Sequence, residues 1–241
     1  MTKRDLYLCG DVHGEFNSLF HISSFPHSDV IVLGDFGMGF DKSFNSFYEK
    51  FEKRLEKNDI TFYVMRGNHD DPSYFDGTHD KPRVKFIKDY EILELGGLKI
   101  LPIGGATSID IDWRIDKNKE YEHYGSSRRV WWENEGVQEI PLRKLPKVVD
   151  LVISHTAPIQ FEPIPFRTDD VSLEQYEKIL SERKYLGTVL DNIKTDYWYY
   201  GHFHTSICRS YNEMLYKGLN ILEIVPAPVK KDNNIQGENN E

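Results

Sequence analysis

The sequence has few cysteines, a deficit of positive charge and no long apolar run. Its 241 residues include two cysteines, Cys9 and Cys208, whose separation matches no metal-binding motif. Two cysteines in apolar stretches suit a reducing compartment, and we expect both side chains to fill the core. The reactive chemistry of the protein therefore has to come from other residue types.

No stretch of the chain is apolar for long enough to span a bilayer. The first residues, MTKRDLYLCGD, contain neither the apolar segment nor the small-residue cleavage site of a signal peptide. We therefore expect a cytoplasmic protein with no membrane partner. The sequence leaves the oligomeric state open.

Acidic residues outnumber basic ones, and the formal net charge is −9 at pH 7. Duplex nucleic acid is disfavoured as a partner, because proteins normally hold it on a basic face. The charge is compatible with a short nucleotide. It is also reduced locally wherever carboxylates hold divalent cations.

The chain alternates between strand and helix signals. Short runs rich in β-branched and aromatic residues predict buried strands at 6–9, 30–33, 61–65, 151–154 and 197–200. Helical spacing of apolar residues predicts an amphipathic helix over 44–55. A capping box of Ser172 and Gln175 predicts the start of another helix, whose apolar stripe begins with Leu173, Tyr176 and Leu180. This alternation implies parallel pairing of the strands.

Two further segments, 84–106 and 207–225, alternate and turn like antiparallel meanders. An α/β fold of two packed mixed sheets with helices outside holds both patterns in one domain. We predict a single domain over residues 1–229. The remaining residues, 230–241, are almost without apolar side chains and are predicted to form a disordered tail.

Polar side chains follow each of the predicted parallel strands. In chain order they are Asp11 with His13 in CGDVHG, Asp35 in VLGDFG, Asn68 with His69 in MRGNHDD, His155 in VISHTAP, and His202 with His204 in YYGHFHTS. Each alone has a plain structural explanation, such as a helix cap, a turn or a satisfied core histidine. Together they place oxygen and nitrogen donors at the strand ends, where open α/β sheets bind ligands. This pattern predicts a site for two divalent metal ions.

The ordered motifs GDVHG, GD, GNHD, SH and GHFH resemble those of the calcineurin-like metallophosphoesterases. The resemblance runs from Asp11 to His204, which is most of the chain. It implies a four-layer α/β/β/α sandwich with a dinuclear metal centre. It also implies hydrolysis of phosphate esters by a hydroxide that bridges the two ions.

The resemblance implies a part for each motif residue. Asp11, His13 and His204 would hold one ion, Asn68, His155 and His202 would hold the other, and Asp35 would bridge them. His69 would be the catalytic residue, which as an imidazolium stabilises negative charge or protonates the leaving oxygen. Asn68 and Arg66 are also candidate substrate contacts. Donors without thiolate suit manganese first, with iron or zinc as alternatives.

The sequence departs from the protein Ser/Thr phosphatases after the second motif. Where they have Asp-Arg-Gly, this chain has GDFGMGFD, which removes a carboxylate that orients the catalytic histidine and an arginine that grips phosphate. A protein phosphatase is therefore disfavoured. Asp70, Asp71 or Asp41 could replace the orienting carboxylate. Arg66 is either a phosphate contact or a solvated strand-end residue.

We predict that residues 107–135 select the substrate. They include Arg114, Arg128, Arg129, Trp113, Trp131 and Trp132. Arginine there could bind phosphate, with Arg114 as the named contact, and tryptophan could stack on a base. Alternatively, the arginines are solvated and the tryptophans cover sheet edges.

The predicted function is hydrolysis of phosphomonoesters or phosphodiesters on a small nucleotide or similar phosphorylated metabolite. One alternative is a nuclease acting on single strands or ends, which the acidic balance disfavours. A second is a non-catalytic interaction scaffold on the same fold. The scaffold is disfavoured because every ligand position and His69 are present.

Overall fold

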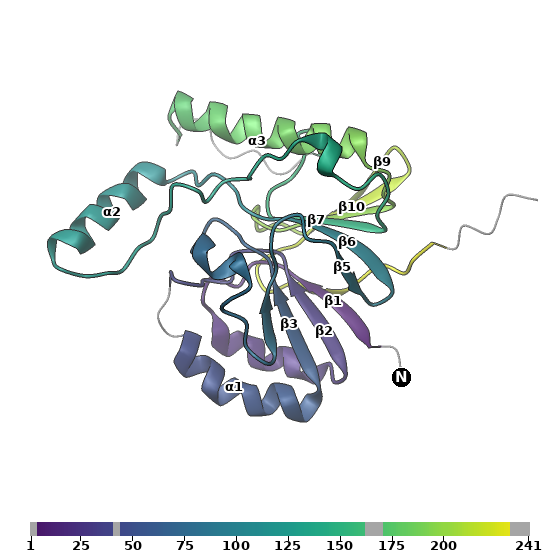
Figure 1. Ribbon diagram of the computed structural model, residues 1–241, viewed down its shortest axis with the longest axis horizontal. Coiled ribbons are helices and arrows are strands. Elements are labelled where there is room, and N and C mark those ends of the chain that lie inside the picture. Colours follow the sequence, from purple (N-terminus) through teal and green to yellow (C-terminus); the bar gives the residue numbers. More distant parts are fainter. Residues whose placement is uncertain (1–3, 41–43, 162–170, 232–241) are drawn as a thin grey trace, which may run out of the picture.

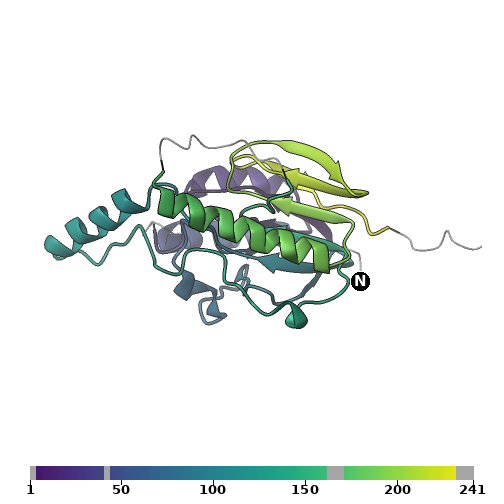
Figure 2. The same cartoon turned by 90° about the horizontal axis from the view of Figure 1, so that it is seen from above.

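The computed structural model describes residues 4–40, 44–161 and 171–231, which contain two mixed β-sheets (Figures 1 and 2). The first sheet has the strand order β11-β1-β2-β3-β4. Its strands are β1 (Asp5–Cys9), β2 (Ser28–Val32), β3 (Ile60–Val64), β4 (Val84–Phe86) and β11 (Ile224–Pro226). The second sheet has the order β5-β6-β7-β8-β10-β9. Its strands are β5 (Leu93–Leu95), β6 (Leu98–Ile103), β7 (Leu151–Ser154), β8 (Tyr197–Tyr200), β9 (Ile207–Tyr211) and β10 (Met214–Gly218).

Helices cover the outer face of each sheet. On the first sheet lie α1 (Phe44–Asn58) and the 3-10 segment η1 (Phe16–Ser24), whereas α3 (Leu173–Asn192) lies on the second (Figure 1). The helix α2 (Ile111–His123) projects from one end of the body (Figure 1). Two short 3-10 turns, η2 (Pro72–Asp76) and η3 (Leu142–Lys144), complete the elements described. The predicted α/β/β/α sandwich is therefore confirmed.

Alternate residues of the central strands point into different cores. In β2 and just after it, Val30 and Val32 pack toward α1, while Ile31 and Leu33 pack between the two sheets. In β7, Val152 packs toward α3 and Ile153 toward the other sheet. Because both faces are buried, such strands are apolar throughout, and this is why the sequence located them.

The two predicted meanders are only partly antiparallel. The strands β5 and β6 form a hairpin that turns at Gly96 and Gly97, but β4 pairs in parallel with β3 in the other sheet. Similarly, β9 and β10 form a hairpin, whereas β11 joins the first sheet antiparallel to β1. Local alternation marks a strand, but its partner is chosen by contacts with distant segments, so these assignments were wrong in part.

Two predictions of burial also need correction. The capping box of Ser172 and Gln175 is present, but Leu173 is 84% exposed and Tyr176 is also exposed. This part of α3 instead turns Gln175 and Glu182 inward, because Glu182 accepts hydrogen bonds from the loop that follows β6. Cys9 is buried as predicted, whereas Cys208 is exposed, because β9 is an edge strand.

No helix among the described residues is long and apolar enough to cross a membrane. The cytoplasmic location and the domain boundary at residue 229 stay predictions. Most of the predicted tail, 232–241, lies outside the described residues. The two lysines that begin it form ion pairs with the body, Lys230 with Asp150 and Lys231 with Asp196.

Candidate metal centre

The predicted metal ligands and the predicted catalytic residue His69 lie in the loops that directly follow five parallel strands. Asp11 and His13 follow β1, Asp35 follows β2, Asn68 and His69 follow β3, His155 follows β7, and His202 and His204 follow β8. Four of these residues have a left-handed backbone, with φ of 50° at His13, 49° at Asp35, 66° at His202 and 50° at His204. Side-chain-bearing residues rarely adopt this conformation, and such strain is concentrated at functional sites.

Glycine beside one candidate ligand makes room for a candidate ligand from another strand. A Cβ atom at Gly34, whose φ is +98°, would lie 2.2 Å from Nδ1 of His155. A Cβ atom at Gly201 would lie 2.3 Å from Oδ1 of Asp11. The glycines that precede Asp35 and His202 in the motifs are therefore needed for the close approach of the strand ends.

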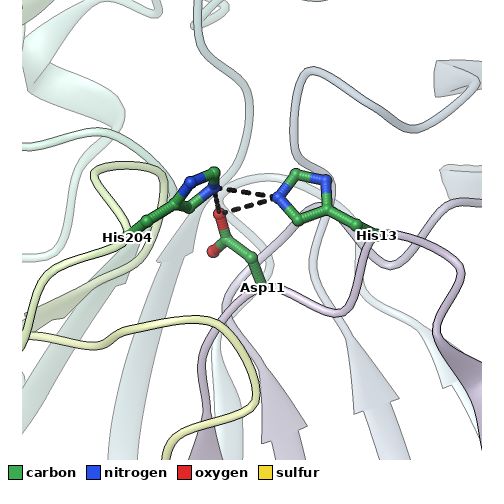
Figure 3. A group of neighbouring side chains, drawn as sticks. All are labelled: Asp11, His13 and His204. Carbon is green, nitrogen blue, oxygen red and sulfur yellow. Dashed lines mark hydrogen bonds and ion pairs between the residues drawn. The ribbon is translucent and has the colours of Figure 1, made fainter.

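Asp11, His13 and His204 form a first group, which we call the outer cluster (Figure 3). The Nε2 atom of His204 lies 3.0 Å from Oδ2 of Asp11 and 2.9 Å from Nε2 of His13. Both imidazoles point toward the carboxylate from opposite sides (Figure 3). The outer cluster is open to solvent, with the side chains of His13 and His204 exposed by 22% and 43%.

Asp35, Asn68, His155 and His202 form a second group, which we call the inner cluster. Oδ1 of Asn68 lies 3.0 Å from Nε2 of His155 and 3.1 Å from Nδ1 of His202. Asp35, Asn68 and His155 are buried. Nδ1 of His155 lies 2.8 Å from the carbonyl oxygen of Leu33, a contact that directs Nε2 toward the cluster.

The carboxylate of Asp35 faces both clusters. Its Oδ1 lies 3.2 Å from Nε2 of His155, and its Oδ2 lies 3.8 Å from Nδ1 of His13. The backbone N–H of His69 donates to Oδ1 at 2.7 Å and holds the carboxylate in place. Asp35 is thus the residue through which the two clusters meet.

The electrostatics of the clusters suit a cation. Burial raises the pKa of Asp35, but His155 and His69 outweigh burial and hold this pKa well below its ordinary value. Burial lowers the pKa of His155, yet Asp35 raises it to about 9. The hydrogen bond to Asp11 raises the pKa of His204. Burial and the neighbouring His155, by contrast, hold the pKa of His202 well below its ordinary value. A protonated His155 thus balances the charge of Asp35, and a metal ion would supply this positive charge when it displaces that proton.

The side chain of His69 bonds to Arg114, and its Nε2 also lies 3.9 Å from Oδ2 of Asp35. Nη2 of Arg114 donates to Nε2 of His69 at 2.6 Å, and Nε of Arg114 donates to Asp110 at 2.7 Å. Burial lowers the pKa of His69 to about 4, and the charge of Arg114 adds to this shift. His69 is therefore a neutral imidazole here with its proton on Nδ1, which differs from the predicted imidazolium.

Two of the three carboxylates predicted to orient His69 have other partners. Asp70 accepts hydrogen bonds from the backbone of Phe36, Gly37, Met38 and Gly67, and so joins the loops after β2 and β3. Asp71 caps η2 by accepting from the backbone of Ser73. Asp41 lies outside the described residues.

Arg66 is buried and fully occupied by protein groups. Its guanidinium bonds to the carboxylate of Asp89 and to the carbonyl oxygens of Gly104, Asn134, Glu135 and Gly136. These contacts join the end of β3 to the segments after β6 and α2. The geometry therefore favours a structural part for Arg66 over the predicted phosphate contact.

The predicted specificity segment holds its aromatic residues in different environments. Trp132 is buried, and Trp131 lines a cavity of about 500 Å³ beside α2 together with Arg128 and Arg129. Trp113 is 55% exposed. Of the arginines, Arg114 is the one that contacts His69, and it belongs to the helix that projects from the body.

Two residues near the inner cluster were not predicted from the sequence. Ser108 accepts a hydrogen bond from Nδ2 of Asn68 at 3.0 Å, and it donates to the buried carboxylate of Glu135 at 2.9 Å. Neither belongs to a motif at a strand end. No local pattern marks a residue that supports a ligand across 40 residues of chain.

A family model described as calcineurin-like phosphoesterase matches residues 5–206. No curated protein sequence matches the chain. Among solved structures, a phosphopantetheinyl hydrolase from Mycobacterium tuberculosis is similar, with 13% identity, a TM-score of 0.45, and coverage of 91% of this chain and 90% of that one. A putative 5'-nucleotidase from Staphylococcus aureus has 11% identity and a TM-score of 0.39, with coverage of 97% of this chain and 55% of that one.

Proposed function

Because the chain belongs to the calcineurin-like phosphoesterase family and is therefore a metal-dependent phosphoesterase, we propose that two divalent ions bind at the inner and outer clusters. We propose a small nucleotide or similar phosphorylated metabolite as the substrate. The observation that supports a site for two ions is the single carboxylate of Asp35, which faces both clusters.

The donor set fits two such ions. Asp11, His13 and His204 would hold the outer ion, Asn68, His155 and His202 the inner ion, and Asp35 both. Oxygen and imidazole donors without thiolate suit manganese, iron or zinc. When bound, a pair of ions supplies a hydroxide nucleophile near neutral pH and neutralises charge on the phosphate.

The chain supplies positioning and charge beside the ions. Arg114 places a buried guanidinium next to His69, so positive charge for the phosphate comes from Arg114 rather than from an imidazolium. His69, whose Nε2 accepts from Arg114, keeps a proton on Nδ1, and this N–H can donate a hydrogen bond to a phosphate or leaving-group oxygen. We propose His69 as a hydrogen-bond donor that stabilises negative charge in the transition state, and Arg114 as its positioning residue and as a substrate contact.

The test is a panel of chromogenic phosphomonoesters and phosphodiesters with manganese, iron, zinc or magnesium. A single-stranded oligonucleotide in the panel tests the nuclease alternative. We expect turnover of small esters that a chelator abolishes and manganese restores. Turnover by thoroughly metal-depleted protein would contradict the proposal, and cleavage of the oligonucleotide alone would favour the nuclease.

A further inference from the structure

The inner cluster includes an amide, and an amide can face a cation in only one orientation. The carbonyl oxygen of Asn68 can bind a metal ion, whereas its NH2 group cannot. In the structure, Oδ1 lies 3.0 Å from His155 and 3.1 Å from His202, and Nδ2 points to the hydroxyl of Ser108 at 3.0 Å. Ser108 therefore has to accept a hydrogen bond from Asn68.

The ionised carboxylate of Glu135 can only accept hydrogen bonds from Ser108. One carboxylate oxygen of Glu135 accepts from the backbone N–H of Ser108 at 2.8 Å, and the other accepts from the Ser108 hydroxyl at 2.9 Å. A hydroxyl has one proton, so the oxygen of Ser108 can only accept on the side that faces Asn68. The direction of both hydrogen bonds is thus set by a carboxylate that is itself completely buried.

We propose that Glu135 is a positioning residue that acts through Ser108 to hold the carbonyl oxygen of Asn68 toward the inner metal ion. This inference rests on the proposed function only in taking Asn68 as a ligand of that ion. Ser108 lies in the segment 104–110 after β6, and Glu135 lies in the segment that follows α2. The contact between these two segments would therefore serve to orient Asn68.

A second buried carboxylate in the same place provides a matched control. Glu182 of α3 accepts from the backbone N–H and the hydroxyl of Thr107, at 2.9 Å and 2.6 Å. Glu182 therefore supports the residue next to Ser108 with the same pair of contacts. It also accepts from the backbone N–H of Val137, and none of these three hydrogen bonds leads to Asn68.

The experiment compares Glu135→Gln with Glu182→Gln in the full chain. The introduced amide at position 135 has one acceptor and one donor group, so it cannot accept from both donors of Ser108. The Ser108 hydroxyl then turns its proton toward Asn68, which favours the reversed amide. We expect Glu135→Gln to bind manganese at the inner cluster about 10-fold to 100-fold more weakly, and Glu182→Gln to keep the wild-type affinity.

A second variant reverses the direction of the hydrogen bonds. In the double variant Asn68→Asp with Glu135→Gln, the new amide donates to Ser108, and Ser108 donates to the new carboxylate, which keeps an oxygen for the ion. We expect the double variant to recover most of the inner-site affinity that Glu135→Gln loses. Affinity is measured by calorimetry and by metal content after gel filtration, with circular dichroism to check the fold.

Three results would overturn the proposal: unchanged inner-site affinity in Glu135→Gln, an equal loss in Glu182→Gln, or no recovery in the double variant. Failure of the proposed function gives a different result. A wild-type protein that binds two ions but hydrolyses no ester would refute phosphoester hydrolysis, while a selective loss of one ion in Glu135→Gln would still support the positioning role.

Discussion

The inner and outer clusters are built from the same kinds of side chain but are held differently. In the inner cluster, His155 is tied to the carbonyl of Leu33 and Asn68 to Ser108, and both ligands are buried. In the outer cluster, the two imidazoles contact each other and Asp11, and both are partly exposed. His155 and Asn68 are therefore held by protein groups, whereas the two outer imidazoles are more open to solvent.

We propose that the two ions, if bound at these clusters, differ in affinity and in access to the substrate. A preorganised, buried site holds its ion tightly, because little conformational freedom is lost on binding. An open site binds less tightly, but it leaves room for a substrate to reach the ion. The following predictions test this contrast, in order of decreasing expected effect.

The largest effect is expected at Asp35, because it is the carboxylate that faces both clusters. Asp35→Asn keeps the shape of the side chain but removes the charge that lets two dications lie close together. We expect a folded protein that binds at most one ion tightly and has lost nearly all hydrolysis. The control is Asp11→Asn, which should weaken chiefly the outer ion. The metal content and the turnover of both variants test this prediction. Two tightly bound ions in Asp35→Asn would show that Asp35 is not needed as a bridge between them.

His69→Ala separates chemistry from metal binding. We expect both ions to remain and turnover to fall roughly 100-fold to 1,000-fold, the range for loss of a hydrogen-bond donor that stabilises negative charge in the transition state. A complication is that His13, Asp35 and His69 also lie close enough to hold an ion together. If metal analysis shows that an ion is lost in this variant, His69 is a ligand and its assignment as a hydrogen-bond donor to the substrate is wrong.

The buried carboxylate that supports the inner cluster should make metal-free stability depend on pH. Burial raises the pKa of Glu135 from 4.5 to about 7, so the folded state prefers the neutral acid more than the unfolded state does. Relative to Glu135→Gln, the wild-type free energy of unfolding should be highest below pH 4.5 and fall by up to about 3 kcal/mol as pH rises through about 7. Denaturant unfolding of both proteins across this range measures the difference, and parallel pH profiles would show that Glu135 does not titrate in this way.

The smallest effect concerns the order in which the ions leave. We expect a chelator titration of the manganese-loaded protein to remove the outer ion first, with affinities that differ by about 10-fold or more. Asp11→Asn should lack the early step and keep the late one. Loss of both ions in a single step from the wild type would mean that the clusters do not differ in affinity.

Much of the fold and the candidate site is predictable from local pattern. Buried parallel strands are marked by short apolar runs, and the polar residue that ends each run shows where a strand reaches the edge of its sheet. This pattern is what marks Asp11, Asp35 and His155 as candidate ligands. Their places in two clusters follow from the structure, and their binding of metal stays a prediction.

The sequence by itself determined the residue types, the strand ends and the family resemblance, because each of these depends on short stretches of neighbouring residues. Only the tertiary structure decided that β4 and β11 join the first sheet, that Arg114 contacts His69, and that Glu135 supports Asn68 through Ser108. Each of these depends on segments far apart in sequence that meet when the two sheets pack. Such contacts are set by the burial and hydrogen bonding of the whole domain, so they cannot be recognised from the local periodicity of apolar and polar residues.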